Sequence, residues 1–497
     1  MKTKLFTVLI ILAIGLAGIT RPAQAQQAYT TSFTTSITYM NVGSAETTVL
    51  DILFYATPTS TTYITIHRLP LAAGAGTSVS IGSLGEIDPG FQGSAVMQAD
   101  QPLLATLVQV PVSGTVKVRP MSNGFGGGAP QSLIATVLKN KFSPPANTVF
   151  SVQNVDSQDN NINIKFYEPT LGMVYEMDTT VASGAAYYYD TGAAGDPLPI
   201  DANNAFNGSA VVTASRVGGG DGAIISSVME LETTGKGAKA FEGVAQGAMD
   251  YFMPSALCKY NSSGALQDTA YAVQNTSLTD PTDITVTYDN GIAETKTALP
   301  GAKASFVTCN TPLMPTGYKG AAMIHSSATP VIAVGKAYNG GLSTGFVGTA
   351  TGTGSDKIAL PYVRYATDAN YASGGDANIL GQRSFIAIQN VGAAAITGNI
   401  TVEYRTCTGA LAGTHTLTPA NYPDGVELKI GEKVNSRANF AGLTEFGMCE
   451  LGTPKFGGAA IVNGPADSEL AVIVRVQNLD PETSLFVGED YNGINYP

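Results

Sequence analysis

One pattern of short segments recurs four times along the 497-residue chain, about every 115 residues. The first segment of each copy ends in an asparagine, and these residues are Asn41, Asn154, Asn275 and Asn390. Their spacings are 113, 121 and 115 residues. A period of this length, with the segments always in the same order, is typical of an array of whole domains. The repeat therefore predicts tandem modules rather than one large fold.

Two more segments complete each copy. The second alternates apolar and polar residues, as in Ile284-Thr285-Val286-Thr287-Tyr288, which indicates a strand with one buried face. The third reads aromatic, any residue, glycine, then small residues, and its glycines are Gly93, Gly208, Gly320 and Gly458. We interpret the asparagines as turn caps that bond the backbone two residues on. We interpret the glycines as points where two backbones approach closely or where a bulge forms.

The predicted strands are short, rich in Val, Ile, Thr and Tyr, and separated by clusters of Gly, Pro, Asn and Asp. With 56 Gly and 26 Pro, helices would be broken throughout the chain. Seven or so strands in about 110 residues match an immunoglobulin-like sandwich. We therefore expect an all-β protein of four tandem Ig-like β-sandwich modules in a linear array. A membrane barrel also alternates, but it needs even strand spacing and aromatic girdles rather than a non-uniform motif.

The N-terminus has the features of a signal peptide. Lys2 and Lys4 precede an apolar run, and Ala23-Gln24-Ala25 fits the small-x-small cleavage rule. The run is short for a bilayer span, and we expect no transmembrane segment after cleavage. The predicted division is a signal peptide at 1–25 and modules at 26–128, 129–250, 251–354 and 355–497. The predicted location is extracellular, on the cell surface.

The charge balance bears on partners. Cleavage at 25 would remove three of the 26 basic residues and none of the 38 acidic ones, leaving a formal charge of −15. Nucleic acid demands basic patches, so we exclude it as a partner. Charged residues make only 13% of the chain, which predicts a surface of Thr, Ser, Asn and Gly. Such a surface opposes association only weakly.

The four cysteines are Cys258, Cys309, Cys407 and Cys449, two in each of the last two modules. In an oxidising compartment this spacing favours the disulfides Cys258–Cys309 and Cys407–Cys449, although the sequence alone allows three pairings. A metal site would call for CxxC-type spacing or nearby histidines, and the sequence has neither.

The chain also resembles a known family. A Leu-Pro-apolar-basic opening, as in Leu360 to Arg364, precedes the asparagine segment, and Phe206-Asn207-Gly208-Ser209-Ala210 shows the glycine step. These features resemble the tandem repeats of large secreted surface proteins of filamentous bacteria. They are similar to bacterial cell-adhesion-related (CARDB/Ig-like) β-sandwich domains. The resemblance covers almost all of the mature chain, implies an extracellular structural or adhesive role, and supplies no catalytic residues.

Residue patterns for chemistry are weak. His67, His325 and His415 lie in different modules, without the spacing of a zinc site or a catalytic triad. Residues 341–345 match G-x-S-x-G but lie in a glycine-rich linker with no helix after them. Asp156, Asp159 and Asn161 are spaced like calcium ligands, but the glycine turn and the bidentate glutamate are missing. We predict no enzyme, no catalytic residues and no cofactor.

The first module differs from the others. Counting 15 residues back from Asn41 reaches Gln26, so the first module is predicted to lack the opening strand of the other three. Such a module exposes an unpaired edge, which invites a strand from another chain. One hypothesis is a head-to-tail polymer in which the C-terminal residues 488–497 complete the first module of a neighbour. The alternative is a capping repeat with a trimmed edge.

Together these patterns predict a secreted structural protein of the cell surface, a component of a surface layer, sheath or extracellular fibre. It would act through sandwich packing and strand edges. Its predicted partners are copies of itself, other surface proteins or glycans. The alternative function is an adhesin that recognises a glycan or a protein.

Overall fold

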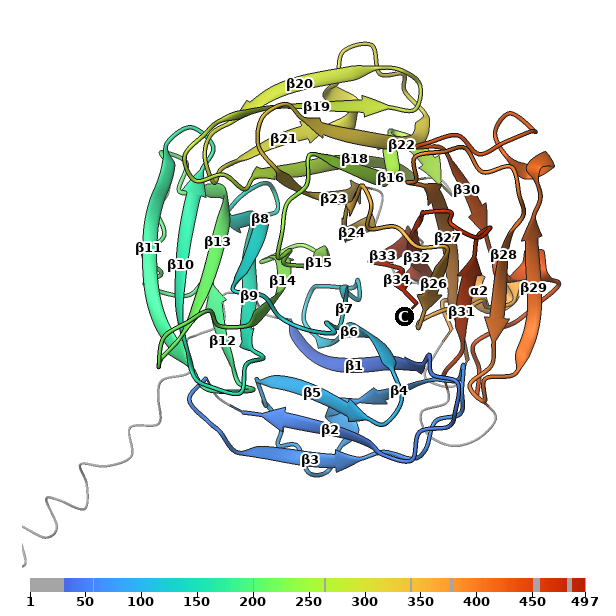
Figure 1. The fold of residues 1–497 in the computed structure, drawn as a ribbon, viewed down its shortest axis with the longest axis horizontal. Helices are drawn as coiled ribbons and strands as arrows, with labels where there is room; N and C mark the ends of the chain where they lie inside the picture. The colour runs from blue at the N-terminus through green and yellow to red at the C-terminus, as the bar shows by residue number, and fades with distance from the viewer. Residues whose placement is uncertain are drawn as a thin grey trace, which may run out of the picture.

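A computed structural model describes residues 31–496, apart from 57, 200, 263–264, 340–341, 376–378, 450–455 and 481–484. The predicted signal peptide lies outside the described residues. The regular structure is almost entirely antiparallel β-sheet, which confirms the all-β sandwich prediction (Figure 1). The described residues contain one short α-helix, α2 (Asp368–Ser373), whose first turn is capped by the Thr367 side chain.

The strands follow one another in four groups along the chain. The first group contains β1 (Ser32–Asn41), β2 (Leu50–Tyr55), β3 (Tyr63–His67), β4 (Gly76–Ser80), β5 (Ser94–Ala99), β6 (Leu103–Ser113) and β7 (Met121–Asn123). The second contains β8 (Gln131–Lys139), β9 (Ala146–Asn154), β10 (Asn160–Glu168), β11 (Gly172–Val181), β12 (Ala186–Asp190), β13 (Phe206–Arg216), β14 (Ile224–Glu232) and β15 (Ala238–Glu242).

The two C-terminal groups repeat this order with additions. The third contains β16 (Asp250–Cys258), β17 (Tyr260–Ser262), β18 (Ala265–Asn275), β19 (Thr282–Tyr288), β20 (Ala293–Ala298), β21 (Lys303–Val307), β22 (Tyr318–Ser326), β23 (Val331–Asn339), β24 (Leu342–Val347) and β25 (Thr349–Ala350). The fourth contains β26 (Lys357–Leu360), β27 (Gln382–Asn390), β28 (Ile400–Arg405), β29 (Leu411–Leu417), β30 (Lys433–Ser436), β31 (Ala459–Asn463), β32 (Leu470–Asp480), β33 (Leu485–Asn492) and β34 (Ile494–Asn495).

Each group contributes strands to two facing sheets, and the inner strands of the third and fourth groups join through β24 and β33 into one nine-stranded sheet. In the second group one sheet runs β11-β10-β13-β8 and the other runs β12-β9-β14-β15. The third and fourth groups have the corresponding orders β20-β19-β22-β16-β25 and β29-β28-β31-β26-β34. In all three, the strand that follows the glycine step pairs with the opening strand, which is β8, β16 or β26.

The first group has only β3-β2-β5 in the corresponding sheet. Among the described residues, no strand pairs with the other edge of β5. An opening strand of the first group would precede Thr31 and so lie outside the described residues, and the predicted lack of that strand stays a prediction. The module boundaries drawn from the sequence remain a prediction, because nothing in the structure shows where a part of the chain would fold alone.

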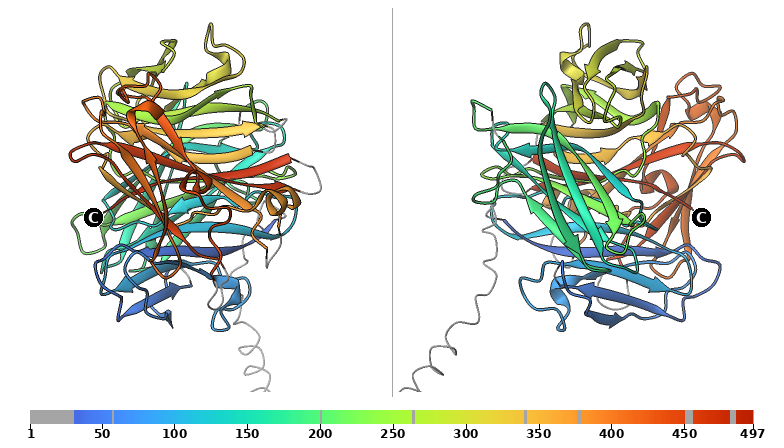
Figure 2. Two further views of the ribbon diagram at one scale, coloured as in Figure 1. Left: turned by 90° about the vertical axis from the view of Figure 1, so that its right-hand side faces the viewer. Right: turned by 60° about the vertical axis from the view of Figure 1, so that its left-hand side comes forward.

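The four groups lie around a ring, and the last returns to the first (Figure 1). Seen from the side, the first and third groups lie on opposite sides of the ring (Figure 2). The Gly458 amide approaches the Gly76 carbonyl oxygen at 3.5 Å. A small apolar cluster joins Met40 and Val42 to Ala359, Ala459 and Ile461. The structure thus differs from the predicted linear array, because the fourth group contacts the first through these residues.

The apolar residues form several clusters rather than one continuous centre. One cluster lies within the first group. The largest fills the second group and also takes in Ala272, Ala302, Ile332 and Val334 of the third. A group therefore shares part of its core with the next group along the ring.

The C-terminal residues are part of the ring. β33 pairs with β32 along its length and meets β24 in a parallel bridge between Gly488 and Leu342. β34 pairs with the opening strand β26. The hypothesis that residues 488–497 complete a neighbouring molecule is therefore wrong, because strands β33 and β34, which span most of this segment, are already paired within this chain. Among the described residues, no helix has the length and apolar character to cross a membrane.

Candidate functional site

The four repeated asparagines occupy the same turn in each group, and all are fully buried. The Oδ1 atom of each accepts a bond from the backbone N–H two residues on. The distances are 2.8 Å to Gly43, 2.9 Å to Asp156, 3.0 Å to Ser277 and 3.1 Å to Gly392. The predicted turn cap is therefore confirmed in every copy.

The amide nitrogen of the same asparagines makes contacts that the sequence did not predict. In the first group the Asn41 Nδ2 atom donates to the carbonyl oxygens of Ala45 and Leu71, both at 2.8 Å. The Asn390 Nδ2 atom donates to Ala394 at 2.9 Å and to Leu428 at 2.8 Å. One buried side chain thus ties its own turn to a segment farther along the chain, which explains why asparagine recurs there.

The repeated glycines lie where the chain approaches another backbone or side chain. A Cβ atom on Gly93 would lie 2.0 Å from the Tyr55 carbonyl oxygen, and one on Gly208 would lie 2.0 Å from that of Tyr167. A Cβ atom on Gly320 would overlap the Asp289 carboxylate. Gly458 has a φ of 101°, which a side chain rarely tolerates. The prediction of close backbone approach is therefore confirmed at Gly93 and Gly208, whereas Gly320 lies against side chains and Gly458 is distinguished by its φ.

These glycine steps also build the junctions between groups. The Ser94 hydroxyl, beside Gly93, donates to the Gly184 carbonyl oxygen of the second group at 2.6 Å. The Ser209 hydroxyl, beside Gly208, donates to Gly301 of the third group at 2.8 Å. At the next junction the Lys433 ammonium of the fourth group donates to the Gly320 carbonyl oxygen at 2.6 Å. Because these partners are about 90 to 113 residues apart, only the folded chain reveals the contacts.

A buried ionic cluster joins the second and third groups. The Lys336 ammonium lies 2.6 Å from the Glu230 carboxylate, and the Thr136 hydroxyl donates to the same carboxylate at 3.0 Å. Lys303 donates to Thr136 at 2.9 Å. Burial holds the pKa of Lys303 well below its usual value. Burial alone would raise the pKa of Glu230, but Lys336 and Lys239 lower it.

The innermost strands of the four groups, β7, β15, β24 and β33, meet near the ring axis (Figure 1). The Asn123 Nδ2 atom donates to the Asn492 carbonyl oxygen at 2.8 Å, and the Asn123 amide bonds the Glu242 carboxylate. The Asn492 Nδ2 atom donates to Val347 at 2.7 Å. Hydrogen bonds of side chains thus connect all four groups at one place, which we call the polar axis.

Two carboxyl groups of the polar axis have altered acidity. Burial raises the pKa of Glu242, and the Asn123 amide opposes this rise. Burial also raises the pKa of Glu489 to about 8, with Arg119 opposing the rise. Asp490, next in the chain, is held by the Arg475 guanidinium at 2.8 and 2.7 Å. The axis therefore carries buried acids whose charge depends on pH.

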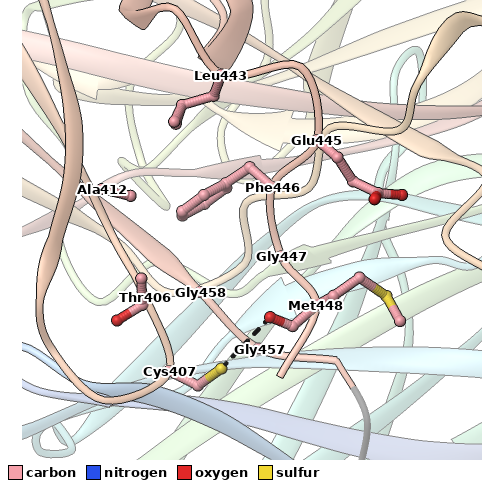
Figure 3. A pocket seen from close by; sticks show the side chains of 10 residues that line it. All are labelled: Thr406, Cys407, Ala412, Leu443, Glu445, Phe446, Gly447, Met448, Gly457 and Gly458. Atoms are coloured by element: carbon pink, nitrogen blue, oxygen red, sulfur yellow. Dashed lines mark hydrogen bonds between the residues drawn. The ribbon is translucent and has the colours of Figure 1, made fainter. Parts of the chain in front are cut away.

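Two surface hollows lie in the fourth group. One of about 220 Å³ is lined by Thr406, Cys407, Ala412, Leu443, Glu445, Phe446, Gly447, Met448, Gly457 and Gly458 (Figure 3). The Cys407 sulfur lies 3.7 Å from the Met448 carbonyl oxygen across this hollow. Figure 3 shows the Phe446 ring between Ala412 and the backbone of Gly447. The lining is mostly apolar and glycine, without a set of convergent polar groups.

The second hollow, of about 400 Å³, is lined by His415, Leu417, Asn421, Pro423, Lys433, Val434, Asn435 and Phe440. The His415 Nδ1 atom lies 2.9 Å from the Ser436 hydroxyl, which lies 3.0 Å from the Tyr404 hydroxyl. Burial lowers the pKa of His415. Ser436 is fully buried, and its hydroxyl is hydrogen-bonded to these two side chains.

The other histidines and the predicted calcium ligands have partners within the chain. His67 pairs with Asp51 and His325 with Asp250, each at 2.7 Å on the surface. Asp156 is paired with the Arg216 guanidinium at 2.7 Å. Asp159 accepts a bond from the Ser183 amide at 3.1 Å, and Asn161 accepts one from the Thr180 hydroxyl at 3.1 Å. Each of these oxygens already has a partner within the chain.

Both predicted disulfides are present, with S–S distances of 2.07 Å for Cys258–Cys309 and 2.11 Å for Cys407–Cys449. Asp268 lies beside Cys258 and Cys309, but oxidised sulfurs are poor metal ligands. Ser343 of the G-x-S-x-G match lies in strand β24, so it does not form a nucleophile elbow.

No family model matches the chain. A search of curated proteins also found no significant match.

Proposed function

We propose that the protein is a secreted structural component of the cell surface, part of a surface layer, sheath or extracellular fibre. The observation that carries this proposal is how the recurring residues are used. The repeated asparagines and glycines are occupied in caps and junctions of a closed ring, as the bonds of Asn41 and Ser94 show. Repeats that pack on one another build one rigid body. Such a body suits a structural role.

Two features support an extracellular location. The disulfides Cys258–Cys309 and Cys407–Cys449 are stable in oxidising compartments and rare in the cytosol. The leader at residues 1–25 would direct export. The resemblance to secreted repeat proteins of filamentous bacteria and to adhesion-related Ig-like domains agrees with both.

The edge strands of the sheets carry side chains that discourage nonspecific pairing with other chains. The strand β20 exposes Ala293, Thr295 and Thr297 and includes Glu294 and Lys296. Charged and hydroxyl side chains on an edge strand discourage nonspecific pairing with other chains. Assembly would therefore use particular surfaces rather than any free edge.

The test is to export the full chain from a bacterial host and study the purified product. We expect a mass that corresponds to residues 26–497 with two disulfides, and ordered layers or fibres by negative-stain microscopy. Protein that stays monomeric at all concentrations while binding glycans on an array would overturn the structural function.

One observation favours the adhesin as a second candidate. The larger hollow places Phe440 beside His415, Asn421 and Asn435. An aromatic face next to amide and imidazole groups suits a small polar ligand such as a sugar. If the adhesin proposal is right, Phe440→Ala abolishes glycan binding, whereas Phe142→Ala, at an exposed aromatic of the second group, leaves it unchanged.

A further inference from the structure

The opening strands of the last three groups are buried on both faces. Seven of the nine residues of β8 are buried, and eight of the nine in β16. One face packs inside its own group, and the other packs on the next group along the ring. Phe252 of β16, for example, packs against Val391 and Ala471 of the fourth group. Each such junction therefore contains a strand that is apolar on both sides.

At the junction between the first and second groups, the core-facing residues of the first group are less buried than their counterparts at the other junctions. The core-facing residues of β5 are Ala95 and Met97, which pair with the buried Phe54 and Ile52. Both are only partly buried. Their counterparts next to an opening strand are 0–2% exposed, namely Ala210, Val212, Ala322, Ile324, Ala460 and Val462.

The same junction differs on the side of the second group. Ile225 and Ser227 of β14 are partly exposed. Their counterparts in the third and fourth groups, Ile332, Val334, Ala471 and Ile473, are 0–3% exposed. In those groups the equivalent residues are covered by the preceding opening strand. At the first junction, the facing residues of β5 and β14 are thus more exposed to solvent than their counterparts at the other junctions, where an opening strand lies between the groups.

The chain's own N-terminal residues fit this position poorly. The spacing of β8 from Asn154 would place an opening strand at residues 18–26, ahead of Asn41. That segment carries Thr20, Arg21 and Gln24, whereas β8 and β16 are buried at the corresponding positions. The proposed export would also remove all but its last residue. The segments of this chain that do fit, β8, β16 and β26, are already paired in the ring.

We propose that the free edge of β5 accepts an extended segment of another protein, apolar on both faces, which adds as a fourth strand between the first and second groups. The backbone groups on the edge of β5 that faces away from β2, which pair with no strand in the described part of the chain, would bond the added strand. Apolar side chains of that strand would cover Met97 and Ile225. The inference deepens the proposed structural function, and it rests on that function for the removal of the leader.

The test uses the purified protein that begins at residue 26 and a fluorescent synthetic peptide of residues 129–141, which contains the β8 sequence. We expect saturable binding of one peptide per protein by fluorescence anisotropy. The matched control peptide carries Leu133→Asp and Val137→Asp and binds at least tenfold more weakly. Equal binding of both peptides, or of neither, overturns the inference.

Two protein variants place the binding site. Ser227→Arg, on the wall formed by β14, weakens peptide binding at least tenfold, whereas Thr213→Arg, on the exposed surface of the second group, leaves it unchanged. In a second variant, residues 131–143 are copied directly ahead of Thr31, which supplies the strand covalently. That protein melts at a higher temperature and no longer binds the peptide. A graft with unchanged melting temperature and unchanged peptide binding contradicts the proposal.

The remaining outcomes separate this inference from the proposed function. A dimer that forms without peptide and is lost in Ser227→Arg would overturn the added segment in favour of a second copy of this chain. Layers or fibres of a protein that does not bind the peptide would contradict this inference and would still support the structural function. A protein that binds the peptide but never forms layers or fibres would support this inference and contradict the structural function.

Discussion

At the scale of single residues, buried polar side chains hold the turns of this protein. The repeated asparagine is the clearest case, because one side-chain amide bonds backbone groups of its own turn and of a segment farther along the chain. In the third group Asn275 bonds the Ser277 amide and the carbonyl oxygens of Asp280 and Ala298. Buried backbone groups that lose their partners are costly, so such a residue is hard to replace.

Asn275→Ala should therefore destabilise the protein strongly. It leaves buried backbone groups without partners, and we expect a loss of about 3 kcal/mol in the free energy of unfolding. Urea denaturation followed by circular dichroism measures the loss. The matched control is Asn290→Ala, which removes a similar turn bond to the Ile292 amide at an exposed position and should cost under about 1 kcal/mol. Equal losses in the two variants would refute the role of the buried amide.

At the scale of strands, the glycine step allows one strand to pass close to its neighbour and changes its register. In β13 the pairing with β8 shifts between Gly208 and Ala210, which marks a bulge or irregularity. The step ends next to Ser209, whose hydroxyl reaches the third group. A local irregularity of one strand thus sets a contact between groups.

Gly208→Ala tests this step. Its Cβ atom would lie 2.0 Å from the Tyr167 carbonyl oxygen, and relieving the overlap requires the backbone to move. We expect a loss of about 2–4 kcal/mol and a lower melting temperature. Gly218→Ala is the control, because the nearest atom to its Cβ would be 3.8 Å away. A neutral Gly208→Ala by calorimetry would show that the close approach is not required.

At the scale of the whole molecule, the ring is closed by contacts between its two ends and by the polar axis. The first and fourth groups meet at Gly76 and Ala459, and the innermost strands share hydrogen bonds around Asn123 and Asn492. Changes at these places should affect the ring as a unit rather than one sheet.

Gly76→Val should loosen the closure. A Cβ atom on Gly76 would lie 3.2 Å from the Ala459 Cβ atom, and the two branches of valine need more room than that contact leaves. We expect a larger radius of gyration by small-angle X-ray scattering, with the β content by circular dichroism retained. Gly85→Val, where the added side chain meets open space, should leave the radius unchanged. An unchanged radius in Gly76→Val would argue against closure through this contact.

The polar axis should make stability depend on pH. Burial raises the pKa of Glu489 to about 8 in the folded protein, whereas an unfolded glutamate titrates near its usual value of about 4.3. The folded state then binds more protons in between, so this group's stabilisation is complete below about pH 4 and is lost as the pH rises through 8. Glu489→Gln should flatten this dependence and raise the melting temperature at pH 8.5. Identical melting curves of both proteins across this pH range would contradict the prediction.

The sequence by itself determined the β character, the fourfold repeat, the asparagine caps and the close backbone approach at Gly93 and Gly208, and it favoured one of three possible disulfide pairings. These features depend on local periodicity, turn chemistry and the positions of a few cysteines, all of which are written within single copies of the repeat. Only the tertiary structure decided that the copies close into a ring, that residues 488–497 pair within it, and that polar residues meet on its axis. Those outcomes depend on which sheet faces pack together, and residues such as Gly76 and Gly458 carry no local pattern that names their distant partner.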